Sequence, residues 1–377
     1  MTPEINQPED RVTIGITHGD INGISYEIII KSFQDQRIFD LFTPIVYGHS
    51  KVAAYYRNSV NLPDFNFNII KSVDKAHQKK PNLINVSEGE VRIEMGQPSS
   101  SAGQLAVESL EMAVRDLKHG RIDAVVTAPI NKHSIQSDKF RFPGHTEYFA
   151  EKFDAGDVLM LMVSDRLRMG VATAHLPIKD VSSHLTQDLL ESKLRVYHEG
   201  LMRDFGIRKP RIAALGLNPH AGEEGLLGNE ENDVIIPVVN KLMEEGKLIY
   251  GPFPADGFFG SDAYSKYDGI LAMYHDQGLI PFKSMSFSKG VNYTMGLPVI
   301  RTSPAHGTAF EITGKNIASP ESLRAAMYLA VDIYRNRKIY DEVSKDPLPY
   351  HMIEEENNRT RQADESQGDF SQDSDIQ

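Results

Sequence analysis

The chain has 377 residues, of which 40% are hydrophobic, and a formal net charge of −12 at pH 7. This acidic balance argues against non-specific binding to nucleic acid or to an anionic membrane surface, since both require a basic footprint. Because cysteine is absent, disulfides, thiolate metal sites, iron–sulfur clusters and cysteine nucleophiles are excluded. The N-terminus is too polar for a secretory signal and no apolar run reaches the ~18 residues of a membrane span, so we expect a cytoplasmic protein.

Short apolar runs alternate with helical patterns along the first part of the chain. We expect strands at residues 11–17, 43–47, 66–70, 83–86 and 123–128, and helices at residues 24–33, from about 51, 101–118 and 146–153. The helix at 101–118 has the clearest amphipathic pattern, because Leu105, Leu110 and Leu117 recur at helical spacing. Ser100 or Ser101 is expected to cap its N-terminus.

The same alternation continues to residue 335. We expect a β-hairpin at residues 158–174, strands at 211–217 and 268–274 and within 291–302, and helices at 186–205, 230–245 and 320–335. This order predicts an α/β protein with a mainly parallel sheet, in which ligands bind beyond the carboxyl ends of the strands. Residues 354–377 are polar and acidic, and we expect them to form a disordered tail.

Three histidines each follow a strand-like apolar run and stand beside Gly, Pro, Asn or Asp. They are His175 in TAHLP, His220 in LNPHAGE and His275 in MYHDQG. Three imidazoles from separate loops can bind one divalent ion and leave positions open for a substrate. We therefore interpret the trio as a candidate metal site with Glu223 and Asp276 as candidate partners of the imidazoles, although a single histidine is more commonly a surface or structural residue.

Two further groups of residues are candidates for binding an anion. Residues 143–147 read PGHTE, a turn leading into a helix, where Thr146 as N-cap and His145 as a donor would favour an anion. The alternative is a plain capped helix with an incidental histidine. The second group carries amide or positively charged side chains that suit a phosphate or carboxylate, although any one of them can be an ordinary surface residue: Lys283, Asn292 and Arg301.

Residues 305–315 form a glycine-punctuated segment before the last helix. Its small side chains allow a ligand to approach the backbone closely, but the pattern alone does not specify phosphate binding. No GxGxxG follows the first strand, and no GxxxxGK[ST] or GxSxG occurs in the chain. A Rossmann dinucleotide site, a P-loop and a serine-hydrolase elbow are therefore not supported.

Seven segments together resemble the PdxA family of 4-hydroxythreonine-4-phosphate dehydrogenases, NAD-dependent enzymes of pyridoxal phosphate biosynthesis. They are GITHGDINGI (15–24), PGHTEYFAE (143–151), TAHLP (173–177), LNPHAGEEG (217–225), GPFPADGFF (251–259), AMYHDQGLIPFK (272–283) and GVNYTMGLPVIRTSPAHGTAFEITG (290–314). The resemblance extends from about residue 11 to 340. The first motif departs from the usual TPGDPAGIGPE, since residues 17–27 read THGDINGISYE.

The resemblance implies an isocitrate/isopropylmalate dehydrogenase-like fold of two α/β domains with the active site in the cleft between them. We expect one domain at residues 1–132 plus 283–353, on the NAD-binding side, and a second domain for metal, substrate and dimerisation at residues 133–282. The family further implies a homodimer in which the neighbouring subunit completes the site.

The resemblance also implies roles for particular residues. The three histidines correspond to the family's ligands for one divalent metal (Zn, Co, Mg or Mn), and His145, Thr146, Lys283, Asn292 and Arg301 correspond to its substrate contacts. HGTAFEITG is similar to the NAD loop HGSAPDIAG of isocitrate and isopropylmalate dehydrogenases. The expected cofactor-binding residues are therefore His306, Gly307, Thr308, Ala309, Glu311 and Gly314.

The expected reaction is oxidation of 4-phosphooxy-L-threonine by NAD⁺, followed by loss of CO₂ to give 3-amino-2-oxopropyl phosphate. Asp256 or a metal-linked water is the candidate base, and Lys283 is a candidate catalytic residue. Alternatives are a D-threonate or D-erythronate 4-phosphate dehydrogenase of the same family, a non-catalytic paralogue that binds a phosphorylated metabolite, and a metal-dependent phosphohydrolase.

Overall fold

A computed structural model describes residues 11–286 and 288–346 of the chain. Contacts divide the chain into two units, Met1–Lys338 and Ile339–Gln377. The described part of the second unit continues the last helix to its end at Val343. The acidic tail expected at residues 354–377 lies outside the described residues.

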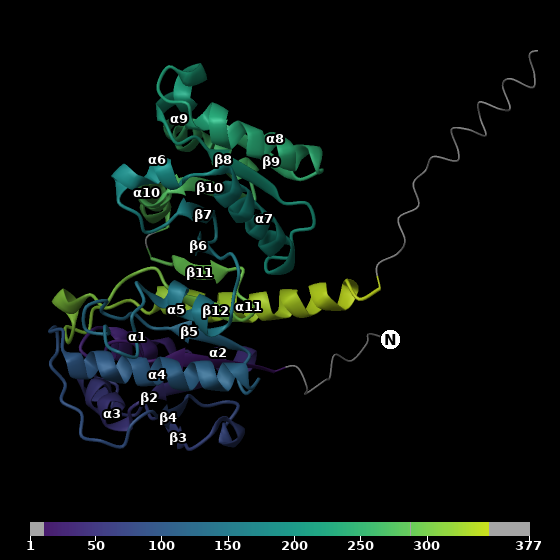
Figure 1. The fold of residues 1–377 in the computed structure, drawn as a ribbon. Coiled ribbons are helices and arrows are strands. Elements are labelled where there is room, and N and C mark those ends of the chain that lie inside the picture. The colour runs from purple at the N-terminus through teal and green to yellow at the C-terminus, as the bar shows by residue number, and fades with distance from the viewer. Residues whose placement is uncertain (1–10, 287, 347–377) are drawn as a thin grey trace, which may run out of the picture. The chain divides into compact units, whose positions relative to one another are not determined.

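The strands of the described residues form one twelve-stranded sheet (Figure 1). In chain order they are β1 (Val12–Thr17), β2 (Phe42–Gly48), β3 (Asn68–Ile70), β4 (Asn82–Asn85), β5 (Ala124–Thr127), β6 (Leu159–Val163), β7 (Arg168–Thr173), β8 (Arg211–Leu215), β9 (Leu248–Phe253), β10 (Gly269–Tyr274), β11 (Val291–Met295) and β12 (Ile300–Pro304). Their order across the sheet is β3-β4-β2-β1-β5-β12-β11-β6-β7-β10-β8-β9. Only the pairs β12–β11, β11–β6 and β6–β7 are antiparallel, so the predicted α/β fold with a mainly parallel sheet is confirmed.

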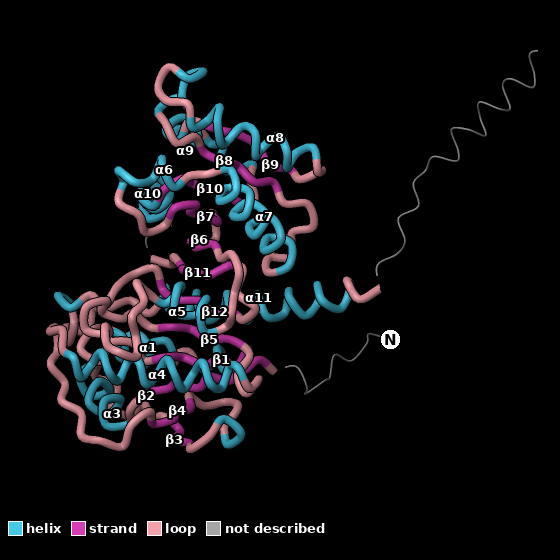
Figure 2. The backbone as a smooth tube through the Cα atoms, in the orientation of Figure 1, coloured by secondary structure: helices cyan, strands magenta, loops and turns pink. Residues whose placement is uncertain are grey.

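Helices connect most of the parallel strands (Figure 2). They are α1 (Ser25–Ser32), α2 (Ile38–Leu41), α3 (Ser50–Ser59), α4 (Ser100–Lys118), α5 (His145–Lys152), α6 (Val181–His184), α7 (Gln187–Arg203), α8 (Ile236–Glu244), α9 (Ala255–Gly260), α10 (His275–Met285) and α11 (Glu321–Val343). None of the helices in the described part of the chain is long and apolar enough to cross a membrane.

The amphipathic pattern of α4 correctly predicts its buried face, since Leu105, Leu110 and Leu117 are all buried. The expected cap was wrong by one or two residues. The side chain of Ser99, rather than Ser100 or Ser101, accepts a hydrogen bond from the backbone N–H of Ala102. The two later serines already have helical positions, where their side chains cannot take that role.

Other differences arise where local sequence signals are weak. The segment at 291–302 forms two strands, β11 and β12, joined by a turn at Gly296, rather than one. Sequence patterns also missed β9, an edge strand that contains Gly251 and Pro252, and α10, which contains Gly278 and Pro281. Glycine and proline lower intrinsic propensity, so packing of α10 on β7 and β10 decides its conformation.

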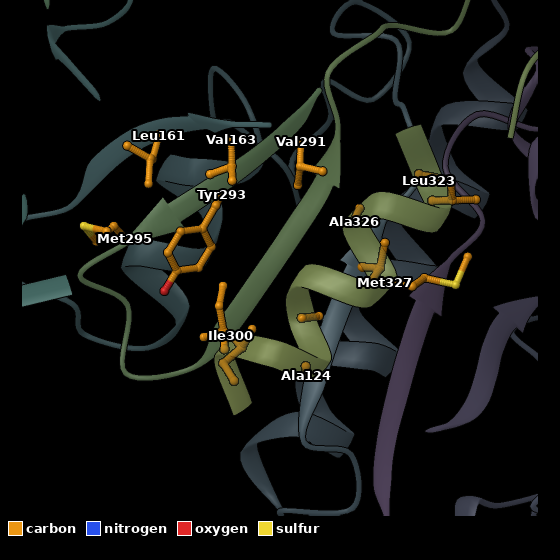
Figure 3. Close-up of a cluster of buried hydrophobic side chains, with 14 of the residues drawn as sticks. Ala124, Leu161, Val163, Val291, Tyr293, Met295, Ile300, Leu323, Ala326 and Met327 are labelled. Atoms are coloured by element: carbon orange, nitrogen blue, oxygen red, sulfur yellow. The ribbon is translucent and has the colours of Figure 1, made fainter. Parts of the chain in front are cut away.

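A buried apolar cluster holds β11 and β12 in place (Figure 3). Successive side chains of a strand point to opposite faces. On β11, Val291, Tyr293 and Met295 belong to this cluster, and Figure 3 shows Tyr293 beside Leu161 of the neighbouring strand. The alternation leaves Asn292 and Thr294 of β11, and Arg301 and Ser303 of β12, on the other faces of these strands.

One sheet runs through both of the domains that the sequence predicts, because β11 of the first pairs with β6 of the second. The proposed boundaries at residues 132–133 and 282–283 stay a prediction.

Candidate active site

A pocket of about 370 Å³ lies at the carboxyl ends of β5 and β12. Its volume suits a small metabolite. Nine of the residues singled out from the sequence line it: His145, Thr146, His175, His275, Lys283, Asn292, Arg301, His306 and Gly307. The chain thus brings together residues that are up to 162 positions apart, from 145 to 307, around one cavity.

Arg301 is a buried cation in the wall of this pocket, with 3% of its surface exposed. Its guanidinium donates to the hydroxyls of Thr127 (2.9 and 3.1 Å), Thr294 (3.2 Å) and Ser303 (2.9 Å), and to Nδ1 of His145 (3.1 Å). Within the described part of the chain it forms no ion pair. Burial lowers the pKa of Arg301 to about 9, although the charge of Glu147 opposes this shift. A buried charge that lacks a counterion is costly, so this arrangement favours an anionic ligand.

The hydrogen bond from Arg301 determines the tautomer of His145. A guanidinium can only donate, so Nδ1 of His145 accepts and Nε2 carries the proton. Nε2 is buried and has no partner among the described residues. Burial, with the positive charges of Arg301 and Lys132, holds the pKa of His145 well below its ordinary value. His145 is therefore a neutral N–H donor beside a cation, which suits a phosphate or carboxylate oxygen.

Thr146 reaches the pocket in a way that the sequence did not predict. The N-cap of α5 is Gly144, and Thr146 lies within the first turn of the helix. The prediction that Thr146 is the N-cap was therefore wrong, because α5 begins at His145, one residue earlier than expected. The Thr146 hydroxyl lies 3.4 Å from the Thr294 hydroxyl, which places a further potential donor beside the Arg301 cradle.

Two charged residues that line the pocket were missed from the sequence. Lys132 follows β5 by five residues, and Glu147 lies on α5. A position shortly after a strand end was the available signal for Lys132, and the location within the PGHTE motif was the signal for Glu147. Glu147 is the one acidic side chain among the described lining residues. The pocket is therefore mainly cationic, with a single carboxylate.

Two of the three candidate metal ligands are neighbours. His175 follows β7, His275 follows β10, and these adjacent strands are parallel. Their imidazole centroids are 6.0 Å apart. Nδ1 of His175 lies 3.5 Å from a carboxylate oxygen of Glu147, and Nδ1 of His275 lies 2.6 Å from one of Asp276. Carboxylates on Nδ1 leave Nε2 as the metal-binding nitrogen, so these two residues fit as ligands of a divalent ion.

His220 follows β8, the neighbour of β10 on the other side. It is exposed, and it does not line the pocket that His175 and His275 share. Accordingly, the described residues contain no group of three or more histidine or acidic side chains placed to hold a metal. The strand order brings the three histidines to one edge of the sheet, but the third side chain is not gathered with the other two. Asp256, the candidate base, is exposed on α9 and also lies outside the pocket lining.

A second pocket of about 710 Å³ shares Lys283, Ala305, His306 and Gly307 with the first. Five of the six residues expected to bind a cofactor line it: His306, Gly307, Thr308, Ala309 and Glu311. Gly314 is not in that lining. Ala309 has a left-handed backbone (φ 44°) at the start of the turn Phe310–Ile312. The two pockets are therefore adjacent, and the second has about twice the volume of the first.

Residues 40–330 match the family described as pyridoxal phosphate biosynthetic protein PdxA. The chain belongs to the PdxA family. It is 48% identical over 341 residues to a Bacteroides thetaiotaomicron protein named 4-hydroxythreonine-4-phosphate dehydrogenase, covering 90% of this chain and 93% of that relative.

Solved structures agree with this membership. A crystal structure of 4-hydroxythreonine-4-phosphate dehydrogenase from Klebsiella pneumoniae is 34% identical, with a TM-score of 0.74 over 87% of this chain and 99% of that one. A terephthalate 1,2-cis-dihydrodiol dehydrogenase from Burkholderia xenovorans is 28% identical, with a TM-score of 0.59 over 86% and 98% of the two chains. Both relatives are oxidoreductases by name, and they differ in the compound that is named as substrate.

The turn after β1, where the sequence departs from the usual PdxA motif, supports both pockets. The backbone N–H of Asp20 donates to the carbonyl oxygen of Pro129, a residue that lines the first pocket. The backbone N–H of Ile24 donates to the carbonyl oxygen of Thr308, which lines the second pocket. A Cβ on Gly23 would lie 2.7 Å from the Thr308 carbonyl oxygen, so glycine is required at this close approach. The residues that make these contacts are ones that the chain shares with the usual motif, and they lie directly behind loops that line the two pockets.

This turn buries two titratable groups with opposite pKa shifts. Burial lowers the pKa of His18 from 6.5 to about 4, and burial raises the pKa of Asp20 from 3.8 to about 6. Between about pH 4 and 6 the folded chain holds one proton on Asp20, whereas the unfolded chain holds one on His18. The two contributions to the pH dependence of stability therefore cancel in this range.

Single substitutions of Asp20 and His18 should reveal the contribution of each residue to the pH dependence of stability. In Asp20→Asn the unfolded state alone binds the His18 proton, so stability relative to wild type should fall as the pH decreases from about 6.5 to 4. In His18→Phe, which keeps an aromatic ring against Tyr26, the folded state alone binds the Asp20 proton, so relative stability should fall as the pH rises from about 4 to 6. Each slope should approach about 1.4 kcal/mol per pH unit. Urea denaturation across this range measures both, and parallel profiles for the three proteins would contradict the prediction.

Proposed function

We propose that this protein is a 4-hydroxythreonine-4-phosphate dehydrogenase of pyridoxal phosphate (vitamin B6) biosynthesis. The proposed reaction converts 4-phosphooxy-L-threonine and NAD⁺ to 3-amino-2-oxopropyl phosphate, CO₂ and NADH. Family membership supports the reaction type, and the names of close relatives support the substrate. We further propose a cytoplasmic homodimer in which the partner subunit completes the site.

The observation that carries the proposal is the buried guanidinium of Arg301, whose hydrogen bonds within the described residues all go to neutral groups. A phosphate or carboxylate would supply the missing counter-charge and accept from His145 Nε2. Lys132 and Lys283, which line the same pocket, suit the second anionic group of a substrate that carries both phosphate and carboxylate. Asn292 and Thr146 would orient these groups through neutral hydrogen bonds.

The reaction further requires a divalent cation and NAD⁺, and residues that line the two pockets support the proposal of both. His175 and His275, held at Nδ1 by carboxylates, would bind a divalent cation (Zn, Co, Mg or Mn) with His220 as the third ligand. When bound, the cation would supply Lewis acidity at the substrate hydroxyl and at the enolate that develops on loss of CO₂. The candidate base is Asp256, or else a water at the metal, and Lys283 is a candidate catalytic residue beside the substrate.

The second pocket fits NAD⁺, which would supply the hydride acceptor. The loop from His306 to Ala309 allows close approach, since a Cβ on Gly307 would meet no atom within 4 Å. The Glu311 carboxylate in that pocket would accept hydrogen bonds from an adenosine ribose and would repel a 2′-phosphate, which favours NAD⁺ over NADP⁺. Because Lys283 and His306 line both pockets, the substrate and the nicotinamide would be neighbours.

The decisive experiment is a steady-state assay of the purified full chain with 4-phosphooxy-L-threonine and NAD⁺, with and without a chelator. We expect reduced cofactor to accumulate only when metal is present. Faster reduction of NAD⁺ with D-threonate or D-erythronate 4-phosphate would instead favour a sugar-acid phosphate dehydrogenase of the same family. These substrates are included because structural relatives of the chain are named for different compounds. Phosphate release without NAD⁺ reduction would indicate a phosphohydrolase, and ligand binding without turnover would indicate a non-catalytic paralogue.

A further inference from the structure

The turn that carries His220 has a backbone conformation that L-amino acids rarely adopt. Five consecutive residues, His220 to Glu224, have φ angles of 53, 51, 79, 43 and 56°. Only Gly222 among them lacks a Cβ, and each of the others disfavours the left-handed conformation. Backbone strain of this kind persists only where the surroundings over-determine it, and it clusters at functional sites.

The buried carboxylate of Glu231 holds the entrance to this turn. One of its oxygens accepts the backbone N–H groups of Leu217 (2.7 Å) and Asn218 (2.8 Å), and the other accepts the side-chain amide of Asn218 (2.9 Å). Glu231 is 1% exposed, and within the described residues it has no ion pair. A buried carboxylate needs such hydrogen bonds, so the carboxylate and the turn stabilise each other.

The same carboxylate also fills the space behind the middle of the turn. A Cβ on Gly222 would lie 2.6 Å from Oε2 of Glu231 and 3.1 Å from the carbonyl oxygen of Gly228. Glu231 itself begins a single π-helical turn, Glu231–Ile235, a rare conformation that is frequent at functional sites. One side chain therefore controls both how the chain enters the left-handed turn and how closely the turn packs.

A neighbouring residue connects this turn to the segment after His175. The Glu230 carboxylate accepts from the side-chain amide of Asn218 (2.7 Å) and from the hydroxyl of Ser182 on α6 (2.5 Å). α6 begins six residues after His175. The carboxylate of Glu230, which is not a metal ligand in the proposed site, thus joins the two segments that carry His175 and His220.

We propose that Glu231 is a positioning residue for the metal site. It keeps the turn left-handed and thereby fixes the position from which His220, which lies outside the pocket lining, would reach a cation held by His175 and His275. This inference rests on the proposed function, from which it takes the metal and its three ligands. It adds a residue that contacts none of the reacting groups.

The test measures binding of Co²⁺ or Zn²⁺ to the purified full chain by competition with a chromophoric chelator. Glu231→Gln and Glu231→Ala should bind the metal roughly 10–100-fold more weakly than wild type. Gly222→Ala should show the same loss, since its methyl group displaces the carboxylate, and it provides a second measurement if Glu231→Ala fails to fold. Activity of these variants should recover at saturating metal, which a general structural defect would not allow.

Tyr197→Phe is the matched control. It removes buried hydrogen bonds to Arg168 and Ile270 at the opposite ends of β7 and β10, so it should reduce stability and leave metal affinity unchanged. Wild-type affinity in Glu231→Gln and Gly222→Ala, with weak binding in His220→Ala, would overturn this inference and leave the proposed metal site intact. Wild-type affinity in His220→Ala would overturn both.

Discussion

Replacing Arg301 by methionine is expected to abolish most activity without destabilising the protein. Loss of a charge-assisted contact to a buried anion costs about 2–5 kcal/mol, which corresponds to a roughly 30- to 4,000-fold decrease in kcat/KM. Because the guanidinium is buried among hydroxyls and an imidazole, an apolar side chain of similar length should leave the free energy of unfolding unchanged or raise it. Steady-state kinetics and urea denaturation measure the two effects.

Arg337 provides a matched control, since it is a buried arginine with a structural role. It pairs with Asp204 at 2.7 Å and donates to the Tyr293 hydroxyl and to the carbonyl oxygens of Leu297 and Pro298. Arg337→Met should therefore lower the free energy of unfolding by about 3–5 kcal/mol. Phosphate should raise the melting temperature of wild type and have no such effect on Arg301→Met. A strong loss of stability in Arg301→Met would show instead that Arg301 is a structural residue.

Replacing His275 by alanine is expected to lower kcat/KM by about 10³-fold or more, because a Lewis acid contributes several kcal/mol to the transition state. His275 belongs to the pocket and adjoins His175, so its loss removes a ligand directly. His220→Ala should cause a comparable decrease, although His220 lies outside the pocket lining in this structure. Activity and metal content of each purified variant measure the effect, and both variants should keep the wild-type circular dichroism spectrum.

His119→Ala is the control for these substitutions. His119 is an exposed residue at the end of α4, where Nδ1 of its ring hydrogen-bonds with the carbonyl oxygen of Arg115. It lies outside both pocket linings, so its loss should leave activity and metal content unchanged. Near wild-type turnover in His220→Ala would remove that residue from the ligand set. The site would then have to be completed by other groups around His175 and His275.

The strand ends and the residues that follow them could be recognised from the sequence. Alternating apolar runs place His175, His220 and His275 just after strands, and the motifs of the PdxA family mark Arg301 and His145. Local patterns failed where the conformation depends on distant contacts. The strand β9 and the helix α10 both contain glycine and proline, and they form because they pack on neighbouring strands.

The sequence by itself therefore determined the α/β class, the order of most elements and the residues with reactive side chains, because these depend on periodicity and turn chemistry within short windows of the chain. Only the tertiary structure decided which groups surround them. The hydroxyls of Thr127 and Thr294 meet Arg301 because β5, β12 and β11 are neighbours in the sheet, and a strand order of this kind follows from long-range packing. The left-handed turn at His220 is likewise intrinsically unfavourable, so no local pattern predicts it, and the buried carboxylate of Glu231 stabilises it from 11 residues further along the chain.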